Sequence, residues 1–140
     1  MATTTQTDRP TPTDPVSLIM SSTLATVQPE DDLVTVAQEL TASEIGVVFV
    51  DSPGEPIGLI SERDLVTVIA LQGEVDRFGQ QQASDIMTSD VVTATTSTSI
   101  AEVGRLMRDA GVRHIPVTDR GRVVGVVSIR DVLEVLLDER

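Results

Sequence analysis

Two short stretches of the chain place a serine and an aspartate three residues apart, where an apolar run gives way to a helical pattern. They are Ser61 with Asp64 in "GLISERD", and Ser128 with Asp131 in "GVVSIRD". On the first turn of a helix this spacing sets both side chains beside unpaired backbone N–H groups, a corner suited to an anion or a polyol. The same pair is also a variant of the capping box, which needs no ligand. The residues alone leave both interpretations open.

The other potentially reactive residues do not indicate an enzyme. His114 is the only histidine and the chain has no cysteine, so no set of transition-metal ligands is present. A Ser–His–Asp triad can be written down, but neither serine stands in a G-x-S-x-G turn. Arg63 and Arg130 either pair with nearby carboxylates or face phosphates. We predict no catalytic residue, no metal site and no enzyme activity.

The two stretches belong to a longer repeat. Residues 16–69 align with residues 83–136 at a constant offset of 67, with about a quarter of the positions identical. Within each copy the apolar spacing alternates between a strand and a helical period. Strands are expected at 24–27, 47–50 and 57–60, helices from 31 or 32 and over 62–71, and the same elements 67 residues later, with the last helix at 129–137. The sequence predicts an α+β fold: two tandem β-α-β-β-α repeats related by a pseudo-twofold axis.

Composition shifts mark the boundaries. Residues 1–14 are rich in Thr and Pro and are expected to form a disordered arm. The first repeat is placed at 15–71, a polar, Gly-containing connector at 72–82 and the second repeat at 83–140. No signal peptide and no apolar stretch of membrane-spanning length is present, which predicts a cytoplasmic protein without a membrane partner.

Charge limits the partners. The formal net charge is −12, and all ten basic residues are Arg. Such a surface repels nucleic-acid backbones at long range but still allows a local basic pocket for a small anion. The absence of Lys fits either a GC-rich genome or a salty cytoplasm, and composition does not separate the two.

Taken over residues 16–138, the chain resembles the CBS domain family, named for cystathionine β-synthase, in which two tandem copies form a Bateman module. The carriers are "DIMTSDVVTATTSTSIAEVGRLMRDAGVRHIPVTDRGRVVGVVSIRDVLEVL" and, more loosely, "SLIMSSTLATVQPEDDLVTVAQELTASEIGVVFVDSPGEPIGLISERDLVTVI". The resemblance implies that clefts between the copies hold AMP, ADP, ATP or S-adenosylmethionine, with no resident cofactor. The closing helices have wide apolar faces, which pack either on the other copy or on a second chain. Together with the resemblance, these faces predict a homodimer.

The resemblance also assigns roles to residues. Asp131 and Asp64 accept hydrogen bonds from ribose hydroxyls, and Ser128 and Ser61 contact ribose or phosphate. The further residues that the resemblance assigns are Arg113 and His114 for phosphates, Ile115 and Pro116 around adenine, Leu24, Ala25 and Thr26 completing the Asp131 pocket, and Val92 and Thr93 lining the Asp64 pocket. Arg130, next to Asp131 in the chain, is a further candidate for a phosphate contact, with pairing to a nearby carboxylate as the alternative.

The two pockets are not expected to be equivalent. The first copy has Gly46 and Val47 where the second has Arg113 and His114, so the Asp131 pocket is predicted to be the better nucleotide site. The Asp64 pocket is then empty or takes a less charged ligand.

Two functional hypotheses follow. The first is a non-catalytic sensor: a homodimer binds an adenosine ligand and passes a change in shape to a separate, unidentified protein. The second is a ligand-independent dimeric scaffold, which the scarcity of aromatic side chains for stacking favours.

Overall fold

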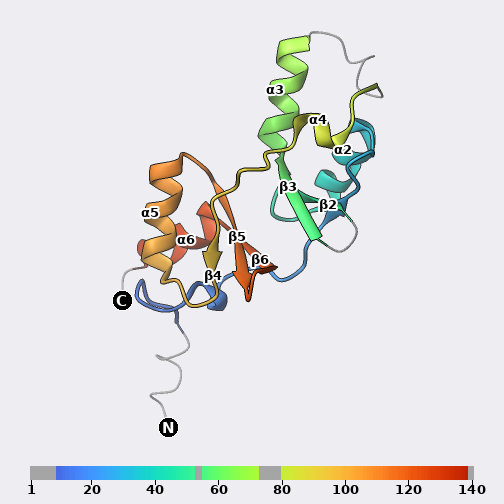
Figure 1. Ribbon diagram of the computed structural model, residues 1–140. Coiled ribbons are helices and arrows are strands. Elements are labelled where there is room, and N and C mark those ends of the chain that lie inside the picture. The colour runs from blue at the N-terminus through green and yellow to red at the C-terminus, as the bar shows by residue number, and fades with distance from the viewer. Residues whose placement is uncertain (1–8, 53–54, 73–79, 139–140) are drawn as a thin grey trace. The chain divides into compact units, whose positions relative to one another are not determined.

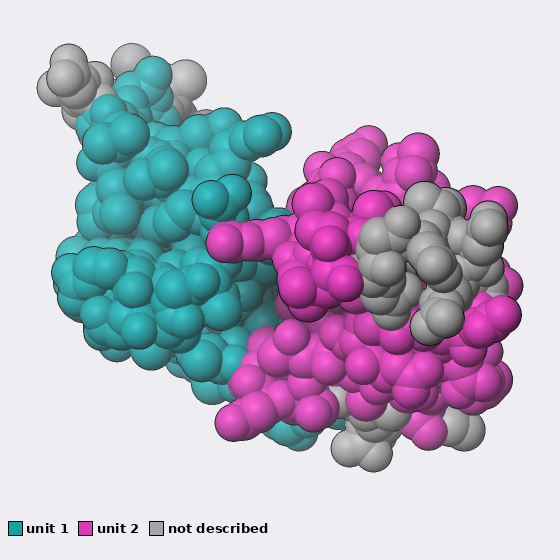
Figure 2. Space-filling model, turned by 90° about the horizontal axis from the view of Figure 1, so that it is seen from above, with its two compact units in different colours: residues 1–23, 92–140 teal, residues 24–91 magenta. Residues whose placement is uncertain are grey.

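The computed structural model describes residues 9–52, 55–72 and 80–138, which form two compact units. One unit consists of residues 24–91, and the other joins the chain before residue 24 to the chain from residue 92 onward (Figure 2). The unit boundaries therefore fall inside the sequence repeats, about eight residues after each repeat begins.

The unit of residues 24–91 is built on a three-stranded mixed sheet. The strand order is β1-β2-β3, with β1 parallel to β2 and β2 antiparallel to β3. The core lies between this sheet and the helices, and includes the fully buried Leu33, Val36 and Ile60. The elements are β1 (Thr26–Val27), α2 (Leu33–Ala42), β2 (Val47–Ser52), β3 (Glu55–Ser61), α3 (Glu62–Gln72) and α4 (Ala83–Ile86).

The other unit repeats this plan (Figure 1). Its sheet has the order β4-β5-β6 with the same parallel and antiparallel pairs, and each hairpin has a register shift at the equivalent place, after Val50 and after Val117. Its core includes Ile100, Ile115 and Val132. The elements are η1 (Val16–Leu18, a 3-10 helix), β4 (Ala94–Thr95), α5 (Ile100–Ala110), β5 (His114–Asp119), β6 (Arg122–Ser128) and α6 (Ile129–Leu136).

Helix starts follow the capping residues in the sequence. The Thr35 backbone N–H donates to Asp32 Oδ1 at 2.9 Å, which caps α2, and the Glu102 N–H donates to Ser99 Oγ at 3.1 Å, which caps α5. The backbone hydrogen bond from Thr35 lowers the pKa of Asp32 below its usual value. The predicted α+β fold and the β-α-β-β-α order are confirmed in both copies, although β1 and β4 are only two residues long.

The leading segments, residues 9–23 before the body of the first repeat and residues 80–91 before the body of the second, each pack on the body of the other repeat. Val16 N donates to Thr98 O at 2.7 Å, and at an offset of 67 Ala83 N donates to Asp31 O at 2.8 Å. The side chains of Val16 and Ala83 are both fully buried. Two antiparallel bridges are also related by the offset of 67: Ser21 pairs with Val126, and Thr88 pairs with Leu59. Each unit thus combines the lead of one repeat with the body of the other.

A close backbone approach holds each leading segment in place. A Cβ at Gly125 would lie 2.6 Å from Met20 Sδ, and one at Gly58 would lie 2.5 Å from Met87 Sδ. Both positions need glycine because the methionine side chain occupies the space of a Cβ. This explains why the repeat keeps these glycines while the neighbouring apolar residues vary.

Residues 9–14 differ from the predicted disordered arm. The Thr11 N–H donates to Asp14 Oδ2 at 2.8 Å, and the chain is fixed to the start of α5 by Ile100 N to Asp14 O at 2.9 Å. These bonds supply partners for backbone N–H groups at a helix start, a reason for order that composition does not reveal. Residues 1–8 and most of the connector lie outside the described residues. Within the described part of the chain, no helix has the length and apolar character needed to cross a membrane.

Candidate functional site

The strand-to-helix corner of the first copy is closed by a reciprocal cap. The Ser61 backbone N–H donates to Asp64 Oδ2 at 2.8 Å, and the Asp64 N–H donates to Ser61 Oγ at 3.2 Å. These bonds satisfy two of the N–H groups that a helix start leaves unpaired.

The corner of the second copy has the same cap. Ser128 donates to Asp131 Oδ2 through its backbone N–H at 3.2 Å and through its hydroxyl at 3.0 Å, and the Asp131 N–H donates to Ser128 Oγ at 3.3 Å. Capping thus engages Oδ2 at both corners, whereas Oδ1 of Asp64 and of Asp131 accepts no hydrogen bond from the described residues. Capping and ligand binding are therefore compatible, because each aspartate keeps one oxygen for a ligand.

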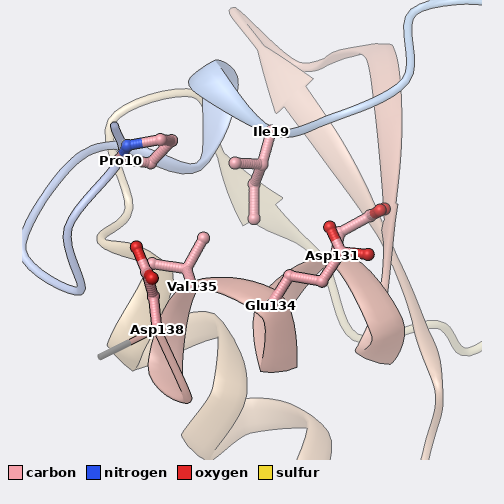
Figure 3. A pocket seen from close by; sticks show the side chains of 6 residues that line it. All are labelled: Pro10, Ile19, Asp131, Glu134, Val135 and Asp138. Atoms are coloured by element: carbon pink, nitrogen blue, oxygen red, sulfur yellow. The ribbon is translucent and has the colours of Figure 1, made fainter. Parts of the chain in front are cut away.

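A pocket of about 360 Å³ lies beside Asp131, within the unit that contains α6. Figure 3 shows its two walls: one is α6 and the turn after it, and the other is the leading segment. Because the leading segment supplies one wall, the exchange of segments between the repeats builds this pocket. The lining residues are Pro10, Ile19, Asp131, Glu134, Val135 and Asp138.

The pocket lining combines three acidic side chains with three apolar ones. Asp131, Glu134 and Asp138 follow one another along one face of α6 and its C-terminal turn. Asp138 Oδ1 lies 3.5 Å from Arg9 Nη1, an exposed ion pair. Glu134 has no hydrogen bond or ion pair with any described residue. In the described part of the chain, no group of three His, Asp or Glu side chains is arranged to hold a metal ion.

The basic pair of the second copy stands next to this corner. The Ile129 N–H donates to Arg113 O at 2.8 Å, and His114 is paired with Ser128 between β5 and β6. Arg113 and Arg130 are exposed and do not line the pocket. This arrangement brings His114 and Ser128 together through the strand register.

The adenine-contacting pair is buried. Ile115 is fully buried and belongs to the core of its unit, and Pro116 is also buried. A contact between adenine and the Ile115 side chain would therefore need movement in the core. The assigned roles of both residues stay predictions.

The corner of the first copy is built differently. Gly46 has a φ of 74°, and a Cβ there would collide with the Glu62 side chain. The Glu62 N–H donates to Gly46 O at 3.1 Å, the counterpart of the bond from Ile129 to Arg113. An acidic side chain thus stands where the second copy has Ile129, and glycine stands where it has Arg113, which fits the expectation that the two pockets differ.

The other predicted site residues lie on the opposite unit from their aspartate. Thr26 is in β1, paired with Phe49, and Ala25 O accepts the Phe49 N–H at 2.9 Å. Leu24, Ala25 and Thr26 belong to the unit of residues 24–91, and Val92 and Thr93 belong to the unit that contains Asp131. Their part in binding stays a prediction.

The sequence alone predicted one of the six pocket residues, Asp131. Glu134, Val135 and Asp138 follow Asp131 at helical spacing, so the period of the closing helix was the signal that could have found them. Pro10 and Ile19 carry no such signal, because their place depends on where the leading segment packs.

A family model described as the CBS domain matches residues 16–71 and 83–138. The chain belongs to the CBS domain family. CBS domains are generally regulatory rather than catalytic modules, and the pair of matches agrees with the two copies in the fold. An uncharacterized protein of Methanopyrus kandleri is 37% identical over 112 residues, which cover 79% of this chain and 56% of that protein. This chain therefore spans little more than half the length of that relative.

Solved structures of CBS proteins have the same fold. The CBS-domain containing protein ATU1752 of Agrobacterium tumefaciens has a TM-score of 0.80 and 32% identity, over 89% of this chain and 94% of that one. The cytosolic domain of the Mg²⁺ channel MgtE, solved in complex with ATP, has a TM-score of 0.70 and 29% identity, over 87% of this chain and 48% of that one. The CBS domain pair of protein MJ0100, solved with 5′-methylthioadenosine and S-adenosylmethionine, is similar in fold with a TM-score of 0.77 and 24% identity, over 89% of this chain and 97% of that one.

Proposed function

We propose that this CBS pair is a regulatory module that binds an adenosine-containing ligand at the Asp131 pocket and signals to a separate protein. The observation that carries the proposal is the Asp131 carboxylate, which lines a pocket while its Oδ1 stays unused by the cap. The MgtE domain bound to ATP, at 29% identity, supports this ligand class. The candidates are AMP, ADP, ATP and S-adenosylmethionine.

A ribose diol suits this carboxylate. Oδ2 already accepts two hydrogen bonds from Ser128, whereas Oδ1 keeps two lone pairs that can accept hydrogen bonds from both ribose hydroxyls. Hydrogen bonds to a charged acceptor contribute about 1.5 to 3 kcal/mol each. Losing one of them should weaken binding at least about tenfold, because about 1.4 kcal/mol corresponds to a factor of ten.

The test is to compare each ligand with its 2′-deoxy analogue by isothermal titration calorimetry. We expect the dissociation constant of the deoxy analogue to be at least about tenfold higher, because one hydroxyl no longer reaches the carboxylate. Equal affinities for the ribose and deoxyribose forms would contradict recognition of the diol.

The same proposal assigns the neighbouring residues. Ser128, His114 and Arg113 would contact ribose or phosphate. The Asp64 corner would bind weakly or take a less charged ligand, since Gly46 and Val47 stand there in place of Arg113 and His114 and the Glu62 side chain lies against Gly46. Signalling then requires only that the ligand bind one of two shapes of the module more tightly than the other.

We further propose that the module is a homodimer. Apolar side chains stay exposed on both closing helices, with Val66 63% and Ile69 42% exposed on α3, and Leu133 42% and Leu136 40% exposed on α6. Faces of this kind are usually covered by another surface. The chain has a mass of 14.9 kDa, and light scattering should give twice that value. A monomer mass at micromolar concentration would contradict the dimer.

A ligand-independent scaffold is the second candidate. The same exposed apolar faces favour it, because they recruit a partner without a ligand. A folded protein that binds none of the four ligands would support the scaffold over the sensor.

A further inference from the structure

The Asp131 pocket has an unbalanced negative charge. Glu134 has no partner among the described residues, whereas Asp138 lies beside Arg9 and Asp131 takes part in its cap. Arg9 contacts Asp138 at 3.5 Å, and Figure 3 shows Asp138 on the opposite side of the pocket from Asp131. Glu134 is therefore the charged lining residue next to Asp131 along α6, whereas the exposed Arg113 and Arg130 do not line the pocket.

This charge is a property of the second copy. The residue that aligns with Glu134 in the first copy is Thr67, and the residue that aligns with Asp138 is Leu71. The ribose-binding corner and its cap are shared by both copies, but the two acids are not. Glu134, which is exposed, is therefore specific to the second copy and lies one turn from Asp131 on the same face of α6.

We infer that Glu134 is a specificity-determining residue: it makes the Asp131 pocket select an adenosine ligand with a neutral or cationic 5′ substituent over one with 5′ phosphates. The inference rests on the proposed function, because it concerns the same pocket and the same aspartate. The apolar side chains of Ile19 and Val135 beside Glu134 suit a 5′ substituent that is alkyl in part. S-adenosylmethionine and 5′-methylthioadenosine have such a group, whereas AMP and ATP have phosphates in its place.

The size of the effect follows from the geometry of the helix. Side chains one turn apart are neighbours at about 5 to 6 Å. For a 5′ group at a similar distance from Glu134 in a water-like dielectric, each negative charge on that group weakens binding about threefold. A phosphomonoester has a charge of about −1.5 to −2, so Glu134 should disfavour AMP about tenfold relative to an uncharged analogue. Salt screens the repulsion, so the selectivity should fall as ionic strength rises.

The experiment measures AMP and 5′-methylthioadenosine by calorimetry at low salt, with the wild-type chain, Glu134→Gln and Glu102→Gln. The two variants make the same change in the same unit, but Glu102 lies on α5, outside the pocket, in an exposed ion pair with Arg105. We expect the ratio of the AMP dissociation constant to that of 5′-methylthioadenosine to fall about tenfold in Glu134→Gln and to stay unchanged in Glu102→Gln. The same comparison between ATP and S-adenosylmethionine should show a larger change, because the charge difference is larger.

The possible results separate a failure of the Glu134 selectivity from a failure of the proposed function. A ratio that is the same in the wild type and in Glu134→Gln, with binding that still requires the ribose diol, would overturn the selectivity and leave the proposed function standing. A ratio that falls equally in Glu102→Gln would assign the effect to net charge and also overturn it. Absence of binding by all four ligands to folded protein would overturn the selectivity together with the proposed function.

Discussion

Val16→Asp should lower the free energy of unfolding by at least about 3 kcal/mol, because an unpaired charge would be buried in an apolar core. Val16 is fully buried, and it packs in the cluster that includes Ile100 and Val132. The loss should fall on the unit that contains α5 and α6, although Val16 opens the first sequence repeat. Ala83→Asp is the matched variant, since Ala83 occupies the equivalent place in the unit of residues 24–91 and is equally buried.

Hydrogen exchange measured by mass spectrometry separates the two units. Val16→Asp should reduce protection mainly over residues 94–136, and Ala83→Asp mainly over residues 26–72. The opposite pattern, with each variant weakening its own sequence repeat, would show that the leading segments are not exchanged.

The repeat made most of the fold predictable. Each copy alternates between a strand period and a helical period, and residues such as Asp32 and Ser99 mark where the helices begin. Two independent copies of a weak pattern reinforce each other, because chance periodicity does not recur at one offset. The observed helix and strand bounds therefore lie close to the expected ones.

The exchange of leading segments was not predictable in the same way. Met20 and Met87 align with each other, and the alignment says nothing about which body each contacts. The contacts of Met20 with Gly125 and of Met87 with Gly58 join residues far apart in the chain. The short helices η1 and α4 escaped notice for the same reason, since tertiary contacts stabilise them more than their own sequence does.

The candidate site was predictable at its polar corner only. The spacing of Ser128 and Asp131 was enough to predict a cap or a ligand contact, and the structure shows that the cap leaves one carboxylate oxygen free. The charge of the pocket was missed because Glu134 and Asp138 resemble any exposed acid on a helix. Glu134 and Asp138 line a pocket only because the leading segment places Ile19 and Pro10 opposite them.

Asp131→Asn should weaken binding of the adenosine ligand at least about tenfold while the fold is kept. The Asn side-chain oxygen still accepts the Ser128 N–H, so the cap at α6 survives. What the substitution removes is the negative charge that strengthens the hydrogen bonds to the ribose hydroxyls. Asp64→Asn makes the same change at the other corner, where Gly46 and Val47 replace the basic pair, and should alter the measured affinity by less than about twofold.

The most direct measurement is therefore isothermal titration calorimetry of the wild-type chain, Asp131→Asn and Asp64→Asn against AMP, ADP, ATP and S-adenosylmethionine. Thermal melting of each variant serves as the control for folding. We expect saturable binding to the wild type and to Asp64→Asn, and binding at least about tenfold weaker to Asp131→Asn. Binding to folded Asp131→Asn as tight as to the wild type would contradict the assignment of the Asp131 pocket as the adenosine site.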